Sequence, residues 1–230
     1  MRPPFPLFLL SLCLPLLGCV SRPAQIPSES FAFSPSVGSP SKTIDPQPVL
    51  VLRSVRVAPA FSGEDFVYRA ADYRYERDPY ARFLSSPGLL IRSTLSDVFL
   101  NSGFFQGVAA GESAIMTHAF TEISVRELYG DFRPGRTPAA VLAMRFLLIQ
   151  SPRARLLWEK TFTRQIPLKE RSASALMRGW NTGLHQILAE AAPLLAQQIR
   201  EADQAAEKAA EPIEREPIGR KPAPPSPPKG

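Results

Sequence analysis

The chain has 230 residues, a length that suits one domain of ordinary size with further segments at its ends. It carries 27 basic and 21 acidic residues, a formal net charge of +6, and only two histidines and two cysteines. So few histidines and cysteines make a poor zinc site, and we expect neither a metal nor a cofactor.

The N-terminal residues have the order of a secretory signal. Arg2 precedes an apolar run, residues 5–17, which is too short to span a bilayer as a helix of about 20 residues. The run ends in Leu16-Leu17-Gly18-Cys19, which resembles the bacterial lipobox. We therefore predict removal of residues 1–18 and lipidation of Cys19. The alternative is an ordinary cleaved signal that a cysteine follows by chance.

A lipidated Cys19 would begin a Pro- and Ser-rich segment, residues 19–48, which we predict to be a tether. Such a composition buries too little apolar surface to offset the entropy of ordering. Val20 stands where an Asp commonly retains bacterial lipoproteins at the inner membrane, so we expect the periplasmic face of the outer membrane. Cys13 leaves with the signal, so the mature chain forms no disulfide and depends on an apolar core.

The predicted domain covers residues 49–211, and its first half mixes strands with one helix. Alternating apolar residues and aromatic residues predict the strands, while a Ser-Pro start and a Ser-Gly end delimit the helix. In chain order, the predicted elements are a strand at 49–57, two short strands within 66–76 around a turn at 70–72, a helix from Ser86 to 101–103, and a strand at 104–108.

The sequence of the second half of the domain predicts a meander of three strands followed by a long helix. The expected elements are strands at 118–129, 139–150 and 155–166, then a helix from Ser172 or Ser174 to Ile199 with a charged extension. Short connections between the strands indicate antiparallel pairing, and Pro193 should kink or divide the helix.

These elements predict an α+β fold, with one antiparallel sheet and two main helices packed on one face. We expect residues 49–199 to fold without either flank, because the apolar pattern is complete within them. Residues 212–230 contain seven prolines and should form a disordered or polyproline tail.

Motifs of catalysis are missing from the sequence. His118 and His185 are the only histidines, no Ser lies in a GxSxG context, and no carboxylate is recognisably paired with either histidine. We interpret both histidines as structural or surface residues, name no catalytic residue, and expect a protein that is not an enzyme. A hydrolase with an unrecognised site is the less favoured alternative.

The positive charge belongs to the domain, because residues 49–199 contain 18 basic and 13 acidic residues. For an exported protein, this charge favours anionic headgroups or an acidic partner, and we expect no nucleic acid. Tyr and Arg often anchor interfaces. The candidate partner surface therefore consists of Tyr68, Arg69, Tyr73, Arg74, Tyr75, Arg77, Tyr80 and Arg82. The alternative places every second aromatic in the core and leaves the arginines merely solvated.

Residues 52–108 resemble the auxiliary lipoproteins of ABC-type transport systems. The matching features are the start at residues 55–69, which ends in Val-Tyr-Arg, then Tyr75 to Tyr80, Phe83, the capped helix, and the Ser102-Gly103-Phe104-Phe105 turn. The later strands and the final helix follow in the same order, so the resemblance covers about residues 49–199. The Pro-rich tail is not part of the pattern.

The resemblance implies a non-enzymatic component of lipid traffic between the inner and outer membranes. Its partners would be a mammalian-cell-entry (MCE) protein of the periplasm, as in Pqi-type systems, with a separate ABC permease and ATPase. The lipid anchor would hold it at the outer membrane, and homo-oligomers are implied because some relatives form rings. No ligand-binding residues carry over. A periplasmic scaffold or assembly lipoprotein without a link to transport is the main alternative.

Overall fold

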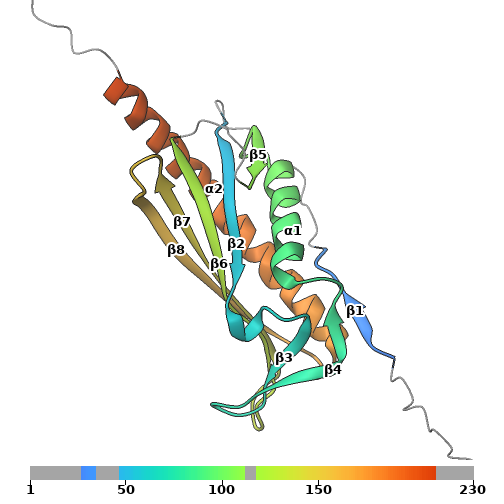
Figure 1. Cartoon of the computed structure of the whole chain (residues 1–230). Helices are drawn as coiled ribbons and strands as arrows, with labels where there is room; N and C mark the ends of the chain where they lie inside the picture. Colours follow the sequence, from blue (N-terminus) through green and yellow to red (C-terminus); the bar gives the residue numbers. More distant parts are fainter. Residues whose placement is uncertain (1–26, 35–46, 112–117, 211–230) are drawn as a thin grey trace, which may run out of the picture.

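A mixed sheet of eight strands, with two helices on one face, forms the computed structural model of the chain (Figure 1). The structure describes residues 27–34, 47–111 and 118–210. The elements in chain order are β1 (Glu29–Phe31), β2 (Val49–Val57), the 3₁₀ helix η1 (Pro59–Phe61), β3 (Asp65–Arg69), β4 (Tyr75–Phe83), α1 (Pro87–Asn101), β5 (Gly107–Ala110), β6 (Ala119–Asp131), β7 (Ala139–Gln150), β8 (Arg155–Pro167) and α2 (Ala173–Ala210). The predicted α+β class is confirmed.

Strands β6, β7 and β8 form the predicted antiparallel meander. β7 pairs with β6 along one edge and with β8 along the other, and its bounds are the predicted ones. Most of its residues are buried, as the nearly continuous apolar sequence requires of a central strand. β8 has a single partner strand in the described chain, so it forms one edge of the sheet.

The expectation of a wholly antiparallel sheet is wrong for the N-terminal half. β2 runs parallel to β6 at Leu52–Val57, and β3 runs parallel to β6 further along, at Tyr68 and Arg69. β5 is also parallel to β2. Helix α1 carries the chain back across the sheet between the β3–β4 hairpin and β5, and such a crossover permits parallel pairing.

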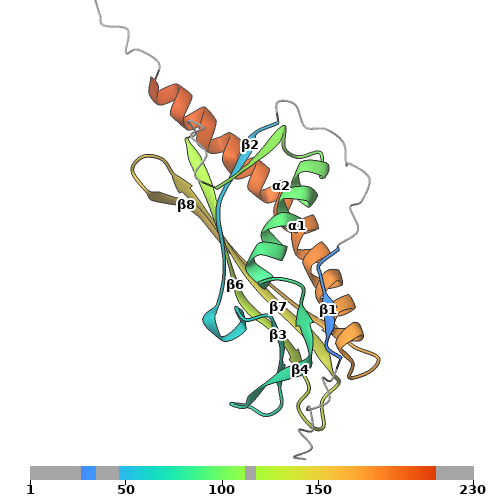
Figure 2. The same cartoon turned by 45° about the vertical axis from the view of Figure 1, so that its right-hand side comes forward.

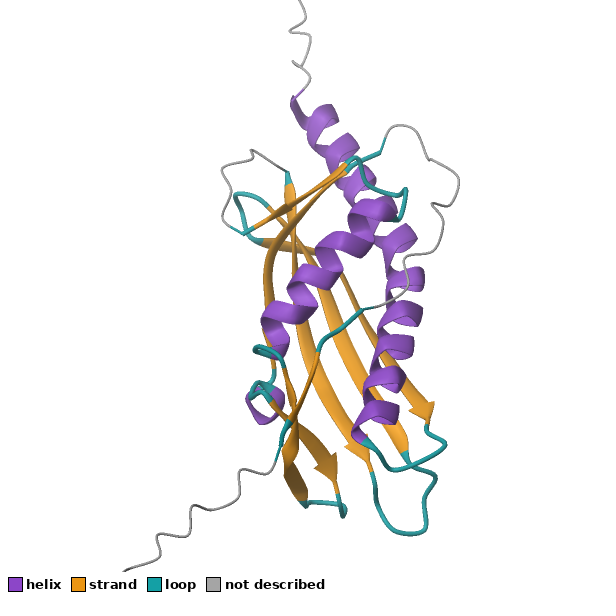
Figure 3. Ribbon diagram, turned by 90° about the vertical axis from the view of Figure 1, so that its right-hand side faces the viewer, coloured by secondary structure: helices purple, strands orange, loops and turns teal. Residues whose placement is uncertain are grey.

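The two helices cover the same face of the sheet, α1 over β2 and β5, and α2 over β7 and β8 (Figure 3). Pro87 occupies the first turn of α1, and Ile91, Leu95 and Phe99 are its buried stripe. Of the two effects predicted for Pro193, division of the last helix is wrong, since α2 is one helix of 38 residues, and a kink stays a prediction. Buried Ala192 and Leu195 on either side of Pro193 keep this part of the helix packed on the core.

Part of the predicted tether belongs to the fold. Residues Glu29–Phe31 form β1, which pairs in parallel with β4 (Figure 2). Phe33 is buried and its ring stacks on Phe83 at 5.6 Å, and the backbone N–H of Ser34 donates to Asn181 Oδ1 at 2.9 Å. The domain therefore begins before residue 49. The signal, Cys19, residues 20–26 and 35–46 of the tether, and the tail at 212–230 lie outside the described residues.

Candidate docking surface

The β3–β4 hairpin carries all eight residues of the candidate partner surface. Its turn closes with a hydrogen bond from Ala70 N–H to the carbonyl oxygen of Arg74, 2.9 Å long, which confirms the predicted turn. Tyr73 lies at the tip with 99% of its surface exposed. A large aromatic side chain that packs on nothing in its own chain is a candidate contact for another surface.

The aromatic residues of this hairpin divide into core and surface. Phe66 and Phe83 are buried against Trp180 of α2, with ring centroids 4.9 and 5.5 Å from the indole. The ring of Tyr68 stacks on Phe132 at 4.8 Å, and its hydroxyl donates to the Asp78 carboxylate. Burial and the hydrogen bond to Asp78 raise the pKa of Tyr68 above its ordinary value, so this phenol stays protonated.

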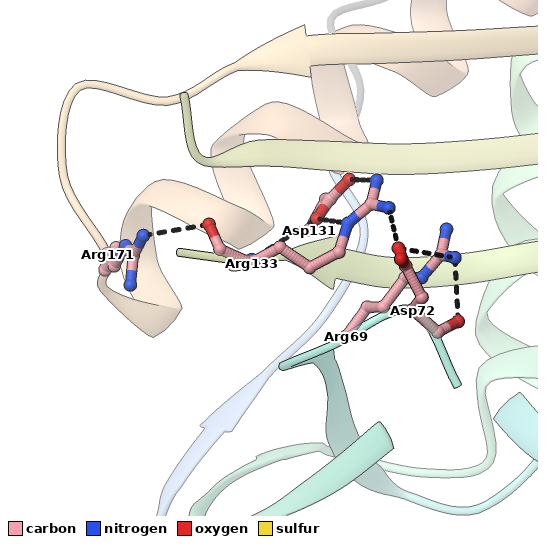
Figure 4. A network of polar contacts seen from close by, with 5 residues as sticks. All are labelled: Arg69, Asp72, Asp131, Arg133 and Arg171. Carbon is pink, nitrogen blue, oxygen red and sulfur yellow. Dashed lines mark hydrogen bonds and ion pairs between the residues drawn. The ribbon is translucent and has the colours of Figure 1, made fainter. Parts of the chain in front are cut away.

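An ion-pair network joins the hairpin turn to the β6–β7 loop (Figure 4). Arg133 donates to both oxygens of Asp131, at 2.8 Å from Nε and 2.6 Å from Nη2, and its Nη1 donates to Asp72 at 2.7 Å. Asp131 is buried, and the hydrogen bonds from Arg133 hold its pKa below the ordinary value. Arg69 Nη2 donates to the carbonyl oxygen of Asp72 at 2.8 Å, so the turn is bound on both sides.

The network extends to the β8–α2 loop, where Arg171 Nη2 donates to the carbonyl oxygen of Arg133 at 3.3 Å (Figure 4). Three connecting segments therefore meet at one end of the molecule, and we call them the loop end. They are the hairpin turn 70–74, the β6–β7 loop 132–138 and the β8–α2 loop 168–172. A hollow of about 490 Å³ adjoins them, between Leu168 and Lys169 of the loop and Arg178 of α2.

The predicted surface residues separate into two groups. Tyr68, Arg69 and Tyr75 hold the fold together, and Tyr75 packs edge-on against Tyr129 at 5.5 Å. The other five are exposed, namely Tyr73, Arg74, Arg77, Tyr80 and Arg82. This second group, together with the exposed part of Tyr75, is available to another molecule.

Sequence reasoning missed Asp72, Asp131, Arg133 and Arg171. Asp72 and Arg133 are 61 residues apart in the chain, so no local pattern relates them. The sequence shows a charged segment at 130–138, and its length predicts a hairpin loop but not the ion pairs that this loop forms.

The two histidines lie apart and exposed, His118 just before β6 and His185 on α2. Within the described residues, no group of three or more His, Cys, Asp or Glu side chains could hold a metal ion. A membrane-spanning helix is also missing from that part of the chain, since none of its helices combines the required length and apolarity.

Comparison with known proteins places this fold. No curated protein matches the sequence. A solved Xanthomonas campestris protein is similar with a TM-score of 0.60 and 18% identity, over 75% of this chain and 95% of that one. A solved uncharacterized protein is similar with a TM-score of 0.55 and 16% identity, over 73% and 99% of the two chains.

The family comparison agrees with the element order. Residues 31–192 match the family described as the ABC-type transport auxiliary lipoprotein component. The match begins at the last residue of β1 and ends on the part of α2 that packs on the sheet. The chain therefore belongs to the family of ABC-type transport auxiliary lipoprotein components.

Proposed function

We propose that this protein is a non-enzymatic auxiliary subunit of an MCE-type lipid transport system, anchored through Cys19 at the periplasmic face of the outer membrane. The family match over residues 31–192 supports the role of an ABC-type transport auxiliary lipoprotein, and the resemblance of residues 52–108 supports the link to MCE proteins. The lipobox at residues 16–19 and Val20 support the anchor and its membrane. The permease, the ATPase and the MCE protein would be separate chains, and this subunit would dock or stabilise the periplasmic end of their conduit.

The outward side of β4 is the surface that we propose for the periplasmic partner. Arg77, Tyr80 and Arg82 lie along this strand and are exposed. Arg82 pairs with Glu64, and Arg77 Nη2 donates to the carbonyl oxygen of Ala60 at 3.5 Å, so both guanidinium groups are held against the neighbouring segment. Tyr80 beside two held arginines has the composition of an interface anchor, and it favours an acidic partner surface.

Co-purification of the tagged full-length lipoprotein with its neighbouring transport proteins tests this function. We expect the wild type to retain an MCE protein together with the permease and the ATPase. The double variant Arg77→Glu, Tyr80→Ser should lose them without a change in melting temperature, because both side chains are exposed.

The matched control is Arg155→Glu, at an exposed position at the other end of the sheet, which should leave the complex intact. Retention of the permease and ATPase without any MCE protein would leave an ABC auxiliary role and contradict the link to MCE transport. Capture of none of these proteins by the wild type would contradict the proposed function as a whole.

A further inference from the structure

The described chain begins close to the loop end. β1 runs parallel to β4, Glu29 lies opposite Ala81, and β4 itself starts at the hairpin turn. Followed back from Phe31 toward Pro27, the chain therefore runs toward the loop end (Figure 2). Six residues of strand separate Ala81 from Tyr75, which is about 20 Å at 3.3 Å per residue.

The length of chain before Pro27 limits how far the domain can stand from its anchor. Cys19 precedes Pro27 by eight residues, which span at most about 28 Å when fully extended. This length exceeds the distance of about 20 Å from Ala81 to the start of the hairpin turn, so a chain of eight residues can extend as far as the loop end. Because β1 belongs to the fold, the length of chain between Cys19 and the fold is far shorter than the tether of some thirty residues that the sequence predicts.

The length of helix α2 allows an estimate of how far each end of this helix lies from the N-terminal segment 27–34. Ser34 is hydrogen-bonded to Asn181, which is eight residues from the start of α2 and 29 residues from its end. At 1.5 Å per residue, the start of α2, beside the β8–α2 loop, is about 12 Å away along the helix, and its far end is about 44 Å away. A lipid anchor at Cys19 would therefore hold the start of α2, and not its far end, near the membrane.

We infer that the loop end rests on the membrane that anchors the protein and binds its anionic phospholipid headgroups. The inference depends on the proposed lipidation of Cys19. It assigns Tyr73 and Arg74, the tip of the predicted partner surface, to the lipid, and leaves the outward side of β4 to the protein partner.

The chemistry of the loop end suits a headgroup surface. Its three segments contain five basic residues, Arg74, Arg133, Arg136, Lys169 and Arg171, against the acidic residues Asp72 and Glu170. Next to these segments, Asp131 pairs with Arg133 and Glu76 pairs with Arg74, so the excess of positive charge comes from the other three basic residues. Arg136 and Lys169 are exposed, and neither forms an ion pair within the described residues. Clustered basic side chains beside a membrane attract anionic lipid, and Tyr is enriched at the headgroup level.

The ion-pair network makes the three segments one surface. Arg133 connects the hairpin turn to the β6–β7 loop through Asp72, and Arg171 connects the β8–α2 loop to Arg133. Tyr73, Arg136 and Lys169 are thus held on segments that are linked to one another before any lipid binds. This preorganisation lowers the entropic cost of binding a flat charged surface.

A fluorescence experiment on the full-length lipidated protein tests the orientation. Cys13 leaves with the signal and Cys19 is modified, so one introduced cysteine is the sole thiol for labelling. The label is placed at Tyr73→Cys or, as matched control, at Ala205→Cys, an exposed position near the far end of α2. The protein is reconstituted into vesicles of phosphatidylethanolamine with about one quarter phosphatidylglycerol and a headgroup-attached quencher.

We expect strong loss of fluorescence at position 73 and none at position 205. Protein that fails to float with the vesicles would contradict the anchor, and hence the proposed function. Protein that floats but is unquenched at position 73 would overturn the inference and leave the hairpin tip free for a protein partner. Quenching at position 205 would overturn it as well.

A second arm tests the headgroup chemistry. Arg136→Glu with Lys169→Glu should reduce quenching at position 73, and Arg155→Glu at the other end should not. Vesicles of phosphatidylcholine alone should reduce quenching in the same way, because they offer no anionic lipid. Equal quenching in both kinds of vesicle would overturn the assignment to anionic headgroups.

Discussion

Arg133 donates two hydrogen bonds to the carboxylate of Asp131, and its remaining terminal nitrogen binds Asp72 on a hairpin 61 residues away. Asp131 is buried, so Arg133 is the group that compensates its charge. Loss of one partner of a buried pair leaves the other charge uncompensated, and this usually costs more than the pair contributes. The arrangement makes the loop end sensitive to single substitutions.

Replacement of Arg133 by Ala should lower the melting temperature by several degrees, because Asp131 would remain buried without its cation. Arg133→Lys should recover part of this loss, since an ammonium keeps the charge but cannot donate in the two-point geometry. Thermal unfolding measures both variants, with the exposed Arg74→Ala as control. An unchanged melting temperature in Arg133→Ala would show that the network does not stabilise the fold.

The same network predicts how stability depends on pH. Hydrogen bonds from Arg133 hold the pKa of both Asp131 and Asp72 below their ordinary values. Because the unfolded state binds protons first as the pH falls, this stabilisation is full above about pH 4 and is lost below it. Asp131→Asn should weaken the fall in melting temperature between neutral and acidic pH. The exposed Asp97→Asn is the control, and an equally steep fall in both variants would contradict the prediction.

Phe33 should contribute to stability although it lies in a Pro- and Ser-rich segment. Its ring is buried and stacks on Phe83, so Phe33→Ala should lower the free energy of unfolding by about 3 kcal/mol. Ser30→Ala, at an exposed position on β1, is the control. A fragment of residues 49–199 should also unfold at lower denaturant than one of residues 27–210. Equal midpoints would mean that β1 adds nothing to the domain.

Two glycines on α2 should respond differently to alanine. A Cβ on Gly179 would lie 2.6 Å from the Cβ of Ala140 on β7, whereas one on Gly183 would find its nearest atom at 3.4 Å. Gly179→Ala should therefore destabilise the protein by about 1–3 kcal/mol through overpacking. Gly183→Ala should be neutral or stabilising by up to about 1 kcal/mol, because alanine favours the helix. Denaturant unfolding of the pair measures the difference, and similar values would refute the close approach of α2 to β7.

Cys19→Ala should leave the protein unprocessed or free of the membrane, because acyl chains would be its strong attachment. Fractionation of cells that express the variant measures this. A variant that is still processed and still sediments with the outer membrane would contradict lipidation at Cys19. Val20→Asp tests the predicted membrane separately, since it should move the lipoprotein to the inner membrane.

Local patterns in the sequence determined those helices and strands in which buried residues recur at a regular spacing. The continuous apolar run of β7 and the Ser-Pro start and apolar spacing of α1 predicted both elements within a residue or two, because each pattern reflects one element against one core. The same holds for the apolar stripe of α2 from Leu176 to Ile199, although Pro193 does not interrupt it. The turn at residues 70–72 followed from its flanking strands.

Tertiary structure alone decided which distant segments meet. Three residues of β1 form a strand only because β4 offers an edge and Phe83 offers a partner for Phe33, so a composition that predicts a tether hides them. The parallel pairing of β2 with β6 and the ion pair of Arg133 with Asp72 likewise join residues more than 60 apart. Periodicity reports how one segment alternates between core and solvent, and pairing between segments depends on the free energy of the whole assembled sheet.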